Sequence, residues 1–149
     1  MKSKKTVFVS GTYELLHGGH VQFFKDAKAV GGPGARLVVC YADDATVLAY
    51  KKRKAILSEA HRRGILEELR TVDIVVMGRK MKDPIFDFVE AFDSIKPDFL
   101  VSTDDDKHAD RKKEFCELRG AKYVQIRKSL DFTPISTSEM RKRLLESES

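Results

Sequence analysis

The stretch that decides the fold is Thr6-Val7-Phe8-Val9, a short apolar run, together with the sequence His17-Gly18-Gly19-His20 that follows it after a turn. The apolar run predicts a buried strand, and the apolar residues between Val21 and Val30 recur at the spacing of a helix. The two histidines therefore stand where a first strand passes to a first helix. Open α/β proteins bind ligands at that end of a parallel sheet, so we expect the functional site there.

Phosphate is the ligand that this junction favours. The first turn of a helix has free backbone N–H groups and the positive end of the helix dipole, and both attract phosphate. Two imidazoles three positions apart, His17 and His20, can bracket one phosphoryl group, and Gly19 between them lets the backbone come close to a ligand. A bare His-x-x-His pattern is weak on its own, because such histidines are also common on helix surfaces.

The rest of the chain alternates predicted strands with predicted helices. The further strands are expected at 36–41, 74–77, 99–102 and 123–126, and the further helices at 43–50, 59–70, 84–95, 109–119 and 139–146. Several of these strands are continuously apolar, which indicates a parallel sheet covered on both faces. We therefore expect one domain over residues 1–149 with an α/β fold, a doubly wound parallel sheet of the Rossmann-like type.

Composition favours some classes of function over others. The chain has 149 residues, and no apolar run approaches the roughly 20 residues of a membrane helix, so we expect no membrane partner and a cytoplasmic location. The net charge of +5 fits an anionic partner. Nucleic acid is not the expected partner, because the sequence lacks a stripe of aromatic residues interleaved with basic ones. Cys40 and Cys116 lack the spacing of metal ligands and are expected to be reduced.

Three further polar groups are candidates for binding, and each also has a simpler structural explanation. The basic run 51–54 precedes Glu59-Ala60-His61-Arg62, and it could bind phosphates or form a solvated surface. The hydroxyl run Ser136-Thr137-Ser138 precedes the last predicted helix, and it could hold phosphate oxygens, cap that helix, or do both. The run Asp104-Asp105-Asp106 could hold a divalent metal or form an exposed turn.

The string from Gly11 to His20, Gly-Thr-Tyr-Glu-Leu-Leu-His-Gly-Gly-His, resembles the signature Gly-Thr-Phe-Asp-x-x-His-x-Gly-His of the cytidylyltransferase-like nucleotidyltransferases. The basic run 51–54 with Glu59-Ala60-His61-Arg62 resembles the family's Lys-rich loop followed by Glu-His-Arg, and Ile135-Ser136-Thr137-Ser138 resembles its second signature. The resemblance is strongest to the glycerol-3-phosphate cytidylyltransferases. It implies transfer of CMP from CTP to a phosphorylated alcohol, a sugar phosphate or a phosphonate, with release of pyrophosphate. It also implies Mg²⁺ or another divalent cation on the triphosphate, and a homodimer.

The resemblance implies roles for individual residues. His17 and His20 would bind the α-phosphate, while Lys51 and Arg62, with a weaker case for Arg53, would neutralise the phosphates. Glu14 stands where the family has Asp, so a metal-linked role could survive with a shifted geometry. The remaining expected nucleotide-binding residues are Gly11, Thr12, Tyr13, Gly19, Asp104, Asp105, Arg127, Ser136, Thr137 and Ser138.

Two alternatives stay open on the sequence. An adenylyltransferase that uses ATP, such as the archaeal FAD synthetases, shares the His-x-Gly-His chemistry and differs in recognition of the base. A non-catalytic nucleotide sensor is the alternative outside enzymes, with Glu14 as the sign of lost activity. The segment 128–134, longer than in the glycerol-3-phosphate enzymes, is expected to shape the pocket for the acceptor.

Overall fold

Five parallel strands form one sheet in a computed structural model that describes residues 4–129, 132 and 135–147. The strand order across the sheet is β3-β2-β1-β4-β5. The strands are β1 (Thr6–Gly11), β2 (Arg36–Tyr41), β3 (Ile74–Met77), β4 (Phe99–Thr103) and β5 (Lys122–Ile126). This all-parallel order confirms the α/β fold expected from the alternation of strands and helices.

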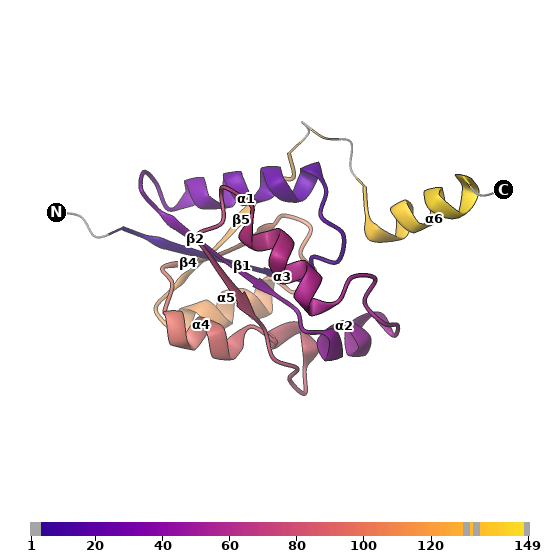
Figure 1. Cartoon of the computed structure of the whole chain (residues 1–149). Helices are drawn as coiled ribbons and strands as arrows, with labels where there is room; N and C mark the ends of the chain where they lie inside the picture. The colour runs from indigo at the N-terminus through magenta and orange to yellow at the C-terminus, as the bar shows by residue number, and fades with distance from the viewer. Residues whose placement is uncertain (1–3, 130–131, 133–134, 148–149) are drawn as a thin grey trace.

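Helices connect the strands and cover the sheet. They are α1 (Gly18–Val30), α2 (Asp44–Lys51), α3 (Glu59–Glu67), the 3₁₀ turn η1 (Pro84–Phe86), α4 (Val89–Ile95), α5 (Ala109–Glu117) and α6 (Thr137–Ser147). Figure 1 shows α1 above the sheet, α4 and α5 below it, and α6 extending away from it. In the described part of the chain, no helix has the length and apolar character needed to cross a membrane.

The centre of the sheet is buried on both faces, as the continuously apolar strands predict. On one face Val7, Val9 and Val39 pack with Phe24 of α1 and Leu66 of α3. On the other face Phe8, Val38 and Leu100 pack with side chains from the α4 and α5 regions, including a cluster of Phe88, Phe92 and Phe115. Both cysteines are buried and free, in agreement with the expectation of reduced, structural thiols.

Helix α1 begins at Gly18, three residues before the predicted start at Val21. His17 makes the early start possible because its Nδ1 accepts a hydrogen bond from the Gly19 N–H at 3.1 Å. The N–H of His17 in turn donates to Nδ1 of His20 at 3.3 Å, so the two side chains cap the helix together. Histidine is not a usual capping residue, and for this reason apolar periodicity placed the start too late.

The single helix predicted over residues 84–95 is wrong, because the structure divides it into η1 and α4. The division falls at Asp87, whose carbonyl accepts a hydrogen bond from the Arg79 N–H at 2.9 Å. A hydrogen bond from another part of the chain thus interrupts the regular hydrogen bonding of the helix. Two other predicted helices end early, α3 at Glu67 and α5 at Glu117, where their last turns tighten into bonds of the 3₁₀ type.

The strand order reverses direction at β1, which pairs with β2 on one side and with β4 on the other. Connections leave the carboxyl ends of these two strands toward opposite sides, which opens a crevice between them. Such a switch point is the usual ligand site of an open α/β sheet. The histidine pair at the start of α1 lies beside it, as the sequence predicts.

Candidate active site

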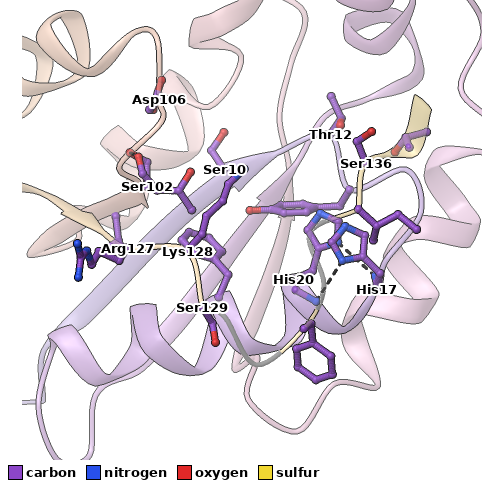
Figure 2. Close-up of a pocket in the computed structure, with 18 of the residues that line it drawn as sticks. Ser10, Thr12, His17, His20, Ser102, Asp106, Arg127, Lys128, Ser129 and Ser136 are labelled. Carbon is purple, nitrogen blue, oxygen red and sulfur yellow. Dashed lines mark hydrogen bonds between the residues drawn. The ribbon is translucent and has the colours of Figure 1, made fainter. Parts of the chain in front are cut away.

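A pocket of about 440 Å³ lies at the carboxyl ends of β1 and β4. Figure 2 shows Ser10 and Thr12 from the β1 end, Ser102 from β4, and His17 and His20 from the start of α1. The remaining lining residues are Tyr13, Gly19, Phe23, Lys51, Val101, Thr103, Asp106, Lys112, Arg127, Lys128, Ser129, Phe132, Ile135, Ser136 and Thr137.

The two histidines stand against each other, with ring centroids 4.0 Å apart. Each ring uses its Nδ1 as a hydrogen-bond acceptor toward a backbone N–H. In a neutral imidazole one nitrogen accepts and the other carries the hydrogen, so these bonds assign the hydrogen to Nε2 in both rings. The pair therefore presents two Nε2–H donors, and the backbone at the start of α1 fixes their positions.

Burial favours the neutral form of both rings. Burial lowers the pKa of His20 to about 4, and the neighbouring His17 adds to the shift. Burial and the charge of Lys128 also lower the pKa of His17. Neutral rings remain hydrogen-bond donors through Nε2, and a triphosphate that brings negative charge would favour their protonation.

Cationic and hydroxyl side chains complete a site suited to phosphates. Lys51 from the end of α2 and Arg127 after β5 both line the pocket, as expected. Ser136 and Thr137 line it at the start of α6, and the Ser136 Oγ also accepts a hydrogen bond from the Glu139 N–H at 3.1 Å. Ser136 therefore caps its helix while it faces the pocket, so capping is compatible with the phosphate contact expected of this hydroxyl.

Tyr13 shapes the floor of the pocket through an unusual backbone conformation. Its φ of 49° lies in the left-handed region, and its ring is buried against the edges of His20 and Phe24. Gly11 makes room for this ring, because a Cβ at Gly11 would lie 2.8 Å from the Tyr13 Cζ. Gly11 itself does not line the pocket, so its part in the site is to seat Tyr13.

Arg62, expected at the phosphates, lies outside the pocket lining. Its side chain is fully buried and donates hydrogen bonds to the carbonyls of Leu57 at 3.0 Å and Thr12 at 2.9 Å. It also donates to the carbonyl of Ala42 and to the Asp44 carboxylate. Arg62 thus ties the turn after β1 to the end of β2, and one of its partners, Thr12, lines the pocket.

Glu14 also has a partner that differs from the expected metal. Its carboxylate is almost fully buried and accepts two hydrogen bonds from Arg53, at 2.9 and 3.1 Å, and one from the Ile56 N–H at 3.1 Å. Burial alone would raise the pKa of Glu14, but these bonds outweigh burial and hold the pKa below its usual value. Within the described residues, no group of three or more acidic, histidine or cysteine side chains is placed to hold a metal.

The acidic run after β4 contributes a different residue from the two expected. Asp104 and Asp105 are exposed and lie outside the pocket lining, and Asp105 pairs with Lys128 at 2.6 Å. Asp106 lines the pocket instead and pairs with Lys112 at 2.6 Å. Ser138 likewise lies outside the lining. The turn after β4 decides which of three adjacent carboxylates faces inward, and sequence spacing does not contain that information.

Several pocket residues carry no signal in the sequence that would single them out. Phe23 and Phe132 form apolar parts of the lining, and Ser102 and Lys112 form a polar part around Asp106. The length of the segment 128–134 was the one available signal for this region, and Lys128, Ser129 and Phe132 from it do line the pocket. The rest of this segment, residues 130, 131, 133 and 134, lies outside the described residues, and so does the expectation for it.

Comparison with known proteins places the chain in a family. Residues 8–143 match the family described as cytidylyltransferase-like. A protein named FAD synthase from Methanothermobacter thermautotrophicus is 34% identical over 143 residues, which cover 94% of this chain and 91% of that protein. Another protein named FAD synthase, from Korarchaeum cryptofilum, is 38% identical over 97 residues, which cover 65% of this chain and 62% of that protein.

Among solved structures, the lipopolysaccharide core biosynthesis protein from Thermoplasma volcanium matches with a TM-score of 0.71 and 25% identity, over 85% of this chain and 99% of that chain. The histidine pair, its place at the switch point and the sequence matches all lead to one assignment. The chain belongs to the cytidylyltransferase-like family of nucleotidyltransferases.

Proposed function

We propose that this protein is an adenylyltransferase of the FAD synthase type, which joins the phosphate of FMN to the AMP part of ATP. The observation that carries the proposal is the match to a protein named FAD synthase over 94% of the chain. This support replaces CTP, the nucleotide expected from the signature, with ATP. The signature residues contact phosphates, which are the same in both nucleotides, so the signature alone favours neither base.

The chemistry is an in-line exchange at the α-phosphorus of the nucleotide. An oxygen of the acceptor phosphate forms a new bond to that phosphorus, while the bond to the β-phosphate oxygen breaks and pyrophosphate leaves with the electron pair. Such reactions depend mainly on positioning and on stabilisation of the charge that develops. In our proposal the Nε2–H groups of His17 and His20 donate to oxygens at the reacting phosphorus.

Three further pocket residues would bind the rest of the triphosphate. Lys51 neutralises charge as a mobile cation, and Ser136 and Thr137 hold the departing pyrophosphate at the start of α6. The nucleotide arrives as its magnesium complex, with most of the metal ligands supplied by phosphate oxygens and water. We do not assign Glu14 to this ion, because its carboxylate already accepts three hydrogen bonds from Arg53 and Ile56.

A direct test is FAD formation from FMN, measured chromatographically beside pyrophosphate release, with ATP and CTP in parallel and with phosphorylated sugars as competing acceptors. FAD formed from ATP supports the proposal. Transfer from CTP, or transfer to a sugar phosphate but not to FMN, contradicts it. Binding of nucleotide with no transfer to any acceptor would favour the sensor.

The substitution His20→Asn tests the role of the pair. We expect it to lower kcat by about 10²–10³-fold, the usual effect of removing one preorganised donor. His61→Asn is the matched control, since His61 is exposed and lies outside the pocket lining, and it should retain full activity. Turnover within a few fold of the wild type for His20→Asn would exclude the donor role.

A further inference from the structure

Phe132 has a position that phosphate chemistry does not explain. Its ring lies directly over Gly18, the residue between His17 and Gly19: a Cβ built on Gly18 would lie 2.5 Å from the ring Cδ1 and 2.6 Å from Cε1. Gly18 has no need of a positive φ, so the missing side chain serves this contact rather than the backbone. The ring is 46% exposed and lines the pocket, so it is seated on the helix start while much of it remains accessible.

The pocket has two chemically different parts. Ser102, Asp106 and Lys112 form a polar part, with hydrogen bonds among Ser102, Tyr123 and Asp106 and an ion pair between Asp106 and Lys112. Figure 2 shows Ser102 and Asp106 well away from His17 and His20, the pair next to which Gly18 lies. Recognition of a nucleotide base requires hydrogen-bonding groups, which the polar part contains, whereas an exposed aromatic ring suits a flat apolar surface.

We infer that Phe132 is a specificity-determining residue that stacks on the flat ring system of the acceptor, and that its contact with Gly18 holds it in place for this. The inference rests on the proposed function, which makes the acceptor FMN. The isoalloxazine ring of FMN is planar and conjugated and gains from face-to-face contact with an aromatic side chain, as nucleic-acid bases do. A polyol phosphate offers no such surface, so Phe132 favours flavin over sugar acceptors.

Steady-state kinetics test which substrate Phe132 contacts. We expect Phe132→Ala to raise the KM for FMN about tenfold, in keeping with the loss of one stacking contact, with kcat and the KM for ATP nearly unchanged. Phe132→Tyr keeps the ring and should restore the wild-type KM. A rise in the KM for ATP instead would mean that Phe132 contacts the adenine, and the inference would be wrong.

Gly18→Ala tests the contact between Gly18 and Phe132 while the phenylalanine itself is unchanged. Alanine favours a helix more than glycine does, so α1 should be retained, yet its Cβ would displace the Phe132 ring. We expect Gly18→Ala to raise the KM for FMN much as Phe132→Ala does, and the double variant to be no worse than either single one. Additive effects in the double variant would show that Gly18 and Phe132 act separately.

Binding provides a readout that does not depend on turnover. The chain contains no tryptophan, so Phe132→Trp introduces a single indole, which quenches flavin emission when the two rings are in contact. Leu118→Trp is the control, because Leu118 is 79% exposed at the end of α5 and lies outside the pocket lining. We expect bound FMN to be quenched by Phe132→Trp and not by Leu118→Trp.

Flavin emission and FAD formation, measured together, separate an error about Phe132 from an error about the enzymatic activity. If the wild type binds FMN and forms FAD, but Phe132→Trp leaves the emission of bound FMN as Leu118→Trp does, the inference alone is wrong. If the wild type neither binds FMN nor forms FAD, the proposed function fails and the inference fails with it.

Discussion

At the scale of single residues, burial keeps the His20 ring neutral by lowering its pKa. Its pKa of about 4 lies below the ordinary value of 6.5, so between these pH values the unfolded chain binds a proton that the folded chain does not. Stability therefore falls as the pH falls through this range. Between pH 7 and pH 5 we expect the wild type to lose about 1–2 kcal/mol more than His20→Asn, measured by urea unfolding.

A comparison of the two proteins at each pH isolates His20. Asp87 is buried with its pKa raised to about 7, chiefly by burial and then by Asp43, and it titrates in the opposite sense. This contribution is present in both proteins and cancels in the difference. Parallel pH profiles for the wild type and His20→Asn would mean that the ring of His20 is not desolvated as the structure indicates.

Arg62 is a second case in which the surroundings of one residue decide its role. We expect Arg62→Met to destabilise the fold by about 3–5 kcal/mol, because it leaves the buried carbonyls of Thr12 and Ala42 without their donor. Arg63→Met, at an exposed neighbouring position, should change stability by about 1 kcal/mol or less. If Arg62→Met unfolds like the wild type but loses nucleotide affinity, the phosphate role first expected for Arg62 is correct.

At the scale of elements, the Glu14–Arg53 pair joins the turn before α1 to the loop after α2 that follows Lys51. Arg53→Gln should destabilise the protein by about 2–4 kcal/mol, because the buried carboxylate of Glu14 loses the two hydrogen bonds from Arg53. Glu14→Gln leaves only the partly exposed Arg53 without its partner and should cost less. Both variants should raise the KM for nucleotide, because the loop after Lys51 is then no longer tied to the turn before α1. The double variant should lose less free energy of unfolding than the two single variants lose together, with a coupling energy of about 1–3 kcal/mol. Strict additivity in urea unfolding would show that the two side chains do not interact.

At the scale of the whole molecule, the pocket spans both halves of the sheet, since its residues come from the β1–α1 junction and from β4. A nucleotide bound there adds stability by mass action. With magnesium and ATP at about a hundredfold above Kd we expect about 3 kcal/mol and a rise in Tm of about 5–10 °C. CTP at the same concentration should raise Tm less, and Lys51→Ala should reduce the ATP effect. An equal rise with both nucleotides would contradict the choice of ATP.

The sequence by itself determined the sheet, its strands and the place of the histidine pair. Strand periodicity and the switch from strand to helix are local properties, so runs such as 36–41 and 74–77 give the observed bounds without tertiary information. The capping role of His17 and the break at Asp87 escaped prediction because each depends on a particular hydrogen bond. As a result, several predicted helix boundaries differ from the observed ones and the helix predicted over 84–95 divides into η1 and α4, whereas each predicted strand is present.

Only the tertiary structure decided which charged residues face the pocket. A charged side chain turns toward whatever acceptors or counter-charges the fold brings within its reach, and these come from distant parts of the chain. Arg62 meets carbonyls of the β1 and β2 ends, Glu14 meets Arg53, and Asp106 rather than Asp105 enters the pocket. Periodicity reports which face of an element is buried, but the partners of a buried charge are set by how the elements pack.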